Sequence, residues 1–161
     1  MEKPKKFNPA HTKAIAKIVN TSPYIVLLSM ELRNLNRGES LIKIETEQKH
    51  HQAYGIIHGG VCASLLDTAI YWAVYAGIEE IVGLTTIDLK VNYLSPVSDG
   101  RLIAKGRSIK TGKKICLGEA SIEDQKGNLI AHGTSTLMVL NKLELPGQAD
   151  LPPKFIYEEN V

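Results

Sequence analysis

A single carboxylate, Asp67, lies in the most apolar segment of the chain. Between Gly59 and Ile78 it is the only formally charged residue, and apolar side chains fall on every face of the helix that this segment predicts. An ionised carboxylate is costly in such surroundings unless it is paired or faces a cleft. Asp67 therefore either has a structural role, bonded to a backbone group or to the hydroxyl of Thr68 or Tyr71, or acts as a catalytic base or nucleophile.

The pair Gly59-Gly60 stands at the start of the same segment. Glycine lets a ligand approach the backbone closely, and the N–H groups of a first helical turn have no partners inside the helix. Such a helix start can bind an anion or stabilise an oxyanion that forms during a reaction. Alone, a Gly-Gly pair before a helix is common in turns. A carboxylate two helical turns later makes the pair a much more specific indication of a functional site.

Other reactive side chains give weaker indications. His50, His51 and His58 are close in sequence, but adjacent histidines are awkward as joint metal ligands and no acidic residue stands at ligand spacing. We expect surface or hydrogen-bonding roles for them, and no metal or other cofactor. Cys62 is expected to be a core residue of the long helix, not a nucleophile. The chain contains no GxSxG motif, so a serine triad is not indicated.

The elements that position Asp67 follow from periodicity and turn residues. The sequence predicts a long helix over 59–77, an amphipathic helix over 9–20 and a helical turn over 23–28 that begins at Ser22-Pro23. Strands are predicted at 29–35, 40–47, 82–94, 101–110, 113–124 and 128–140. Short turns favour antiparallel neighbours. The predicted fold class is α+β, with one antiparallel sheet and the long helix against one face.

Length and composition set wider limits. A chain of 161 residues and 17.7 kDa fits one domain over 1–161, with its core at about 22–140 and a loosely packed tail over 145–161. Nineteen basic against 17 acidic residues leave +2, too weak a bias for nucleic acid binding. The chain has no apolar run of the roughly 18 residues a membrane span needs. We expect no signal peptide, because the first residues are charged and lack an apolar core, and no disulfide framework from two cysteines. We therefore expect a cytoplasmic protein.

The segment HQAYGIIHGGVCASLLDTA, residues 51–69, resembles the signature of the PaaI-like thioesterases. These belong to the hotdog-fold (4-hydroxybenzoyl-CoA thioesterase) superfamily, in which His-Gly-Gly is followed by an acidic residue nine positions after the histidine. The motif from His58 to Asp67 meets that spacing, and the similarity extends over roughly residues 22–140. The resemblance implies six antiparallel strands wrapped around the long helix. It also implies a homodimer, or a dimer of dimers, with sites at the interface.

The same resemblance implies roles for individual residues. Asp67 would be the nucleophile or general base, the Gly59 N–H would polarise a thioester carbonyl, and His58 would shape the turn. Gln52 matches a family Gln or Asn that orients the carbonyl or the water, and Thr86 stands where some members carry a water-orienting hydroxyl. In relatives, the acid of one subunit faces the glycine and the Gln of the other.

Coenzyme A also carries phosphates, which need cations near the mouth of the site. The densest basic cluster is the turn at 107–114, and in relatives this turn and the segment matching 93–98 contact the nucleotide. The residues that we expect to bind the substrate are Gly60, Tyr93, Ser95, Arg107, Lys110, Gly112 and Lys113.

The chemistry of thioesters agrees with this small set of groups. A thioester has little resonance stabilisation, so one carboxylate and one oxyanion donor can suffice where an amide needs a full triad. The sequence thus predicts an acyl-CoA thioesterase. Two alternatives on the same fold are a non-catalytic acyl-CoA sensor and a hydratase or dehydratase. The sensor is disfavoured by the presence of Asp67 and by the lack of room for a helix-turn-helix before Ser22. The hydratase or dehydratase is disfavoured because the helix contains no second acid.

Overall fold

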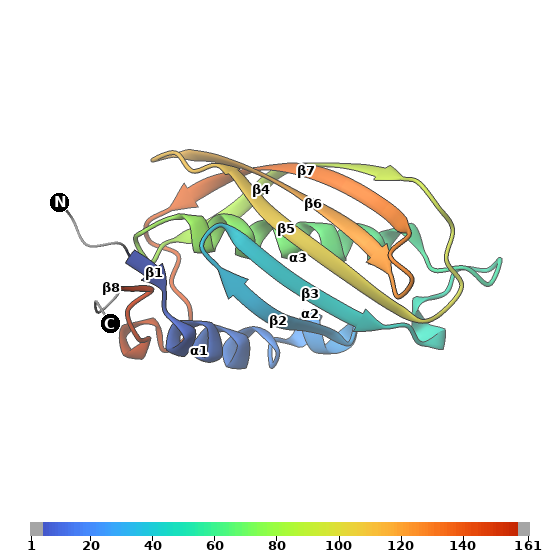
Figure 1. Cartoon of the computed structure of the whole chain (residues 1–161), viewed down its shortest axis with the longest axis horizontal. Coiled ribbons are helices and arrows are strands. Elements are labelled where there is room, and N and C mark those ends of the chain that lie inside the picture. Colours follow the sequence, from blue (N-terminus) through green and yellow to red (C-terminus); the bar gives the residue numbers. More distant parts are fainter. Residues whose placement is uncertain (1–4, 158–161) are drawn as a thin grey trace.

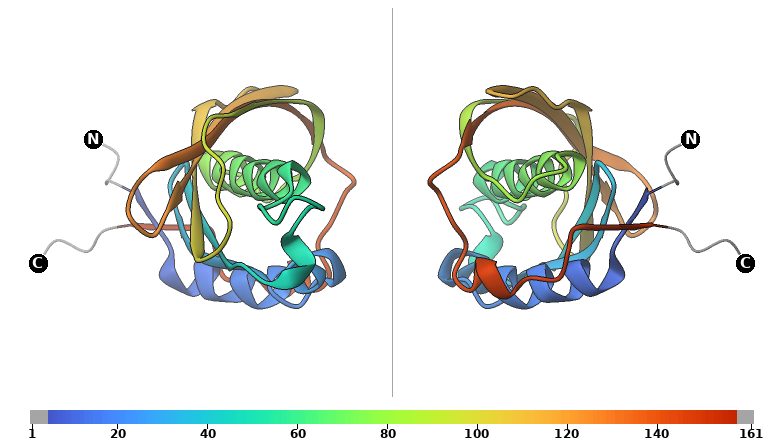
Figure 2. Two further views of the ribbon diagram at one scale, coloured as in Figure 1. Left: turned by 90° about the vertical axis from the view of Figure 1, so that its right-hand side faces the viewer. Right: turned by 90° about the vertical axis from the view of Figure 1, so that its left-hand side faces the viewer.

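The computed structural model describes residues 5–157. Six antiparallel strands form the main sheet in the order β2-β3-β5-β6-β7-β4, and the sheet curls around helix α3 (Figures 1 and 2). In chain order the elements are β1 (Lys5–Phe7), α1 (Pro9–Val19), α2 (Pro23–Leu27), β2 (Met30–Asn36), β3 (Glu39–Glu45), the 3₁₀ turn η1 (Gln48–His50), α3 (Gly59–Gly77), β4 (Gly83–Tyr93), β5 (Arg101–Lys110), β6 (Ile115–Asp124), β7 (Leu129–Leu140), the 3₁₀ turn η2 (Gln148–Asp150) and β8 (Phe155–Tyr157). The predicted α+β class, with six antiparallel strands around one long helix, is confirmed.

Helix α3 is buried because it is apolar on nearly every face. The sheet approaches it so closely that two strand positions admit only glycine. A Cβ atom at Gly106 would lie 2.2 Å from the carbonyl oxygen of Ala69, and one at Gly118 would lie 2.7 Å from Cγ2 of Ile70. Ser40 donates a hydrogen bond of 2.6 Å to the same Ala69 carbonyl. Small residues on both surfaces therefore let the sheet wrap around the helix.

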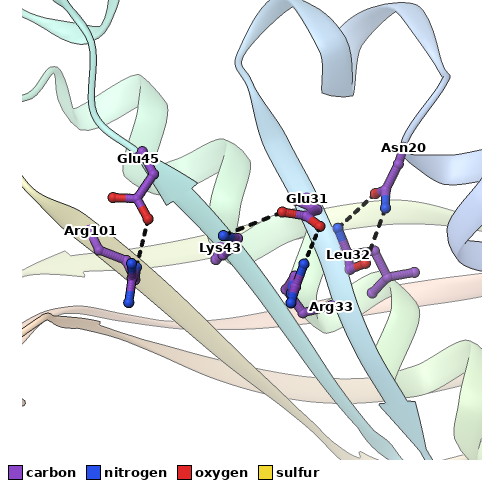
Figure 3. A network of polar contacts seen from close by, with 7 residues as sticks. All are labelled: Asn20, Glu31, Leu32, Arg33, Lys43, Glu45 and Arg101. Carbon is purple, nitrogen blue, oxygen red and sulfur yellow. Dashed lines mark hydrogen bonds and ion pairs between the residues drawn. The ribbon is translucent and has the colours of Figure 1, made fainter.

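The two edges of the sheet differ. At β2, the side chain of Asn20 accepts from the N–H of Leu32 at 2.7 Å and donates to its carbonyl at 3.2 Å (Figure 3). The outer face nearby carries ion pairs from Glu31 to Lys43 and from Arg101 to Glu45 (Figure 3). Asn20 occupies the backbone groups of Leu32 at this edge and so hinders the addition of another strand there. Within residues 5–157, no strand pairs with the outer edge of β4.

A β-bulge interrupts β4 at Ile87. Thr86 is opposite Leu137 and Asp88 is opposite Thr136, so Ile87 is left without a partner position on β7 and is 53% exposed. A bulge changes which residues of a strand face the core. Thr86, before the bulge, contacts α3, whereas Leu89, after the bulge, packs against the core.

The predicted element boundaries agree with the structure within about two residues, with two differences in detail. Ser22 stands at the N-cap of α2 but makes no cap hydrogen bond; its hydroxyl donates to the carbonyl of Val19 at 2.7 Å. The short strands β1 and β8, which pair with each other, are not anticipated by the sequence patterns. No helix in the described part of the chain has both the length and the apolarity needed to cross a bilayer.

The expectation of a loosely packed tail is wrong for the described residues up to Tyr157; residues 158–161 lie outside the described range. Lys154 is only 3% exposed, and its Nζ donates to the carbonyls of Tyr75, Ile78 and Glu80 at 2.8, 2.9 and 2.7 Å. These carbonyls lie at and just beyond the end of α3, where helices leave acceptors without partners. The tail is therefore fixed by the need to satisfy the end of the helix.

Replacing Lys154 with methionine tests this account of the tail. Lys154→Met keeps an apolar side chain of similar length but removes the donor for three carbonyls. We expect the free energy of unfolding at pH 7 to fall by about 2–3 kcal/mol, measured by urea denaturation. The exposed Lys142→Met is the matched control, with an expected change within about 0.5 kcal/mol. Equal effects of the two substitutions would contradict the capping role.

The same pair of variants gives a pH signature. Burial lowers the pKa of Lys154 from its ordinary value of 10.5 to about 7. Between these values the unfolded chain holds a proton that the folded chain has released, so stability rises with pH across this window. Between pH 7 and 10.5, the free energy of unfolding of the wild type, measured by urea denaturation, should rise relative to that of Lys154→Met.

Candidate active site

Asp67 lies on a stripe of α3 that the sheet leaves partly uncovered. The stripe consists of the half-buried residues Ala63, Ser64, Asp67, Thr68 and Tyr71. Its half-buried carboxylate accepts a hydrogen bond of 2.8 Å at Oδ1 from the hydroxyl of Thr86 on β4. Thr68 instead donates to the carbonyl of Ser64, and the hydroxyl of Tyr71 accepts from the backbone of β4. The structural role that involved Thr68 or Tyr71 is therefore not observed. Thr86 holds one carboxylate oxygen, and Oδ2 has no hydrogen-bond donor among the described residues.

Two other ionisable side chains of α3, those of Tyr71 and Cys62, have raised pKa values. Burial raises the pKa of the Tyr71 hydroxyl, and the negative charge of Asp67 raises it further. Tyr71 therefore stays neutral beside the carboxylate. Burial also raises the pKa of the Cys62 thiol, which disfavours a thiolate and agrees with the expected core position of this residue.

The start of α3 leaves one N–H group available. His58 is the N-cap residue, and its Nδ1 accepts from the Gly60 N–H at 2.8 Å. The carbonyl of His58 accepts from the Val61 N–H at 2.9 Å. Within residues 5–157, no acceptor takes the N–H of Gly59. Among the first three N–H groups of the helix, that of Gly59 is thus the one free to bind a ligand, and Gly60 serves the cap.

A cavity of about 280 Å³ opens beside this helix start. Gln52, Gly59, Tyr93 and Ser95 all line it, so the structure brings together four of the predicted site residues. The ring of Tyr93 lies directly over Gly59, because a Cβ atom there would be 3.1 Å from two ring carbons. Apolar side chains such as Val97 and Ile130 complete the wall. Val97 falls in the predicted segment 93–98, whereas sequence reasoning missed Ile130, since its type is common to any buried strand.

The catalytic residues that the sequence predicts form two separate groups in one chain. Asp67 is eight residues beyond Gly59, a rise of about 12 Å along the helix. Neither Asp67 nor Thr86 lines the cavity that contains Gln52 and Gly59. One group can therefore supply a carboxylate, and the other a hydrogen-bond donor and a binding cavity.

The basic turn lies at the far end of α3. Gly77 abuts it, because a Cβ atom there would be 3.1 Å from Ser108 Oγ and from Thr111 Cγ2. The exposed Lys110 and Lys113 are thus about 27 Å along the helix from its start. Gly112 has a structural reason to be glycine, since its Cβ atom would lie 2.4 Å from the carbonyl oxygen of Ile115.

Arg107, also predicted to bind substrate, lies on the outer face of the sheet in a groove of about 430 Å³. It donates to Glu119 at 3.0 Å, and this guanidinium holds the pKa of the Glu119 carboxyl below its ordinary value. Much of its charge is therefore already compensated.

The histidines are hydrogen-bonded. His50 is fully buried, with Nδ1 accepting from the Glu47 N–H at 2.8 Å and Nε2 lying 3.0 Å from the Leu28 carbonyl. His51 bridges the carbonyls of Glu47 and Ser98. The described residues contain no group of three or more His, Cys, Asp or Glu side chains that could hold a metal ion.

Comparison with known proteins identifies this arrangement as a hotdog-fold domain of the thioesterase class. The model of the thioesterase superfamily matches residues 54–131. A Saccharolobus solfataricus protein assigned by name as an esterase is 31% identical over 112 residues, 70% of this chain and 74% of that protein. Human acyl-coenzyme A thioesterase 13 is 26% identical over 113 residues, 69% of this chain and 80% of that protein. A crystal structure of a Haemophilus influenzae thioesterase has a TM-score of 0.75 at 23% identity, covering 83% of this chain and 92% of that one. The chain belongs to the thioesterase superfamily.

Adding one methyl group at Gly59 tests the role of the helix start. Gly59→Ala should change the free energy of unfolding by less than about 1 kcal/mol, because the better helix propensity of alanine offsets the displacement of Tyr93. The methyl group nevertheless obstructs the N–H and the cavity, so thioester hydrolysis should fall about tenfold or more. Gly77→Ala is the matched control: its Cβ atom meets neighbours at the same 3.1 Å, but at the other end of α3. Wild-type activity in a folded Gly59→Ala protein would show that the Gly59 backbone takes no part.

Proposed function

We propose that the protein is an acyl-CoA thioesterase, which hydrolyses an acyl-CoA to a free acid and CoA. The observation that carries this proposal is the placement of Asp67, the only charge on α3, on the uncovered stripe with one oxygen held by Thr86. The free N–H of Gly59 supplies the second requirement, a donor for a carbonyl oxygen. The relative named acyl-coenzyme A thioesterase 13 supports CoA thioesters as the substrate class.

The geometry supports a simple sequence of steps. The Gly59 N–H donates to the thioester carbonyl oxygen and stabilises the negative charge that forms there. Asp67 either removes a proton from the attacking water or attacks the carbonyl itself, and in the second case water then hydrolyses the mixed anhydride. The C–S bond breaks, and the CoA thiolate leaves and is protonated. Gln52 orients the carbonyl or the water from the wall of the cavity.

Two copies of the chain are needed to bring these groups to one substrate. Because Asp67 and Gly59 are about 12 Å apart along one helix, a single chain cannot place both on the same carbonyl. In the proposed homodimer, Asp67 of one protomer faces Gly59 and Gln52 of the other. The open edge of β4 and the uncovered stripe of α3 support this face as the interface, whereas Asn20 blocks the opposite edge at β2. A two-fold axis is the usual symmetry of such pairs.

The proposed dimer also gives the basic turn a role. With Asp67 opposite the partner's Gly59, the two α3 helices run antiparallel, so the last turn of each extends past the start of the other. The turn that carries Lys110 and Lys113 then approaches the partner's cavity, beside Tyr93 and Ser95. Lysine ammonium groups there would pair with the CoA phosphates. In the proposed dimer, the nucleotide of CoA therefore lies between the two protomers.

Removal of the charge at Asp67 tests the proposed function. Asp67→Asn should lower kcat by about 10²–10⁴, while the amide oxygen still accepts from Thr86 and preserves the fold. The measurement is CoA release from a panel of acyl-CoA substrates, with thermal unfolding as the check on folding. Asp150→Asn, in η2, is the control for loss of a surface carboxylate and should leave kcat unchanged. Near-normal turnover by a folded Asp67→Asn protein would exclude the catalytic role.

A further inference from the structure

A second cavity, of about 490 Å³, lies beside α3 on the side of α1 and α2. Its walls are the end of α1 at Ile18 and Val19, the start of α2 at Pro23 and Ile25, Trp72 of α3, and Leu145 of the segment after β7. It shares no lining residue with the cavity at Gly59. Its volume is in the range typical of small-molecule sites.

The chemistry of the walls selects an apolar ligand. No charged side chain lines this cavity, and its two hydroxyl groups are already engaged. Thr21 donates to the carbonyl of Lys17 at 2.9 Å, and Ser22 donates to that of Val19 at 2.7 Å. Neither hydroxyl proton is therefore left for a ligand. An uncharged hydrocarbon group can bury apolar area here without leaving a polar group unsatisfied.

The segment after β7 gives the cavity a fixed outer wall. It passes from the sheet along the open side of the molecule to α1 (Figure 2). Leu143 crosses directly over Gly83, where a Cβ atom would lie 2.4 Å from its carbonyl oxygen. Leu145 packs against the core, and Lys154 anchors the chain further on. The wall is thus held at both ends.

The cavity adjoins the stripe of α3 that carries the carboxylate. Trp72 is five residues beyond Asp67, a rise of about 7.5 Å and a rotation of about 140° around the helix, so the two residues border the stripe from opposite sides. Tyr71 connects the two, since it lies on the stripe and its ring contacts that of Trp72 at 5.1 Å between centroids. A chain attached to a carbonyl at Asp67 can therefore cross the stripe over Tyr71 and enter the cavity at Trp72.

We propose that this cavity binds the hydrocarbon chain of the acyl group and makes the enzyme selective for medium-chain aliphatic thioesters. The assignment rests on the proposed function for the identity of the substrate, but occupancy of the cavity can be measured without catalysis. Short acyl groups end before Trp72 and gain nothing from these walls.

Trp72 is the only tryptophan of the chain, so its fluorescence reports on this cavity directly. Decanoate that carries bromine on its last carbon should quench it in a saturable manner, and unbrominated decanoate should compete. Ile18→Phe and, independently, Leu145→Phe fill the cavity and should weaken the apparent affinity about fivefold or more. Ile103→Phe, at a half-buried position on β5 outside the cavity, is the matched control and should bind as the wild type does. Absence of saturable quenching, or equal affinities in all four proteins, overturns the proposal.

A second measurement follows CoA release from decanoyl-CoA and butyryl-CoA. In Ile18→Phe, kcat/KM for decanoyl-CoA should fall about tenfold or more, while the value for butyryl-CoA stays within about twofold. Equal losses for both substrates would overturn the selectivity. If the wild type binds bromodecanoate but cleaves neither thioester, the proposed function fails while the cavity assignment stands. If the wild type cleaves both thioesters but bromodecanoate does not quench Trp72, the cavity assignment fails while the proposed function stands.

Discussion

Helix α3 is apolar on nearly every face, and the arrangement of the remaining elements follows from the need to exclude water from it. The sheet covers most of the helix by curling around it, which requires glycine at Gly106 and Gly118 where the backbones come closest. Helices α1 and α2 and the C-terminal segment cover another side, and Lys154 satisfies the carbonyls where α3 ends. One stripe remains only partly covered, and Asp67 lies on it.

A carboxylate on such a helix is stable only with a specific environment. Thr86 provides a donor from β4, and the bulge at Ile87 follows immediately, so the strand can point Thr86 at Asp67 and still pack Leu89 against the core. The other half of the proposed chemistry, the free N–H of Gly59, lies about two helical turns away in the same chain. In the proposed homodimer this separation within one chain is the reason for pairing, because a second copy would complete both the uncovered stripe and the open β4 edge.

Much of this structure could be predicted from the sequence because its signals are local. A long and mostly apolar segment between Gly59 and Gly77 specifies α3, and alternating strands between turn glycines specify the sheet. The bulge could not be predicted, since it depends on the register between β4 and β7. The packed tail was also missed, because a lysine among prolines is typical of a solvated segment and the acceptors of Lys154 are more than seventy residues away. For the site, the motif from His58 to Asp67 indicated the residues, whereas the two-group geometry required the fold.

The shared site is tested most directly by a mixed dimer of two inactive variants. Asp67→Asn and Gly59→Val carry different affinity tags, are co-expressed, and the mixed species is purified through both tags. One of its two sites then combines a normal Asp67 with a normal Gly59, so kcat per dimer should be about half of the wild-type value. Activity as low as that of either variant alone would show that each site lies within one chain and would contradict the account.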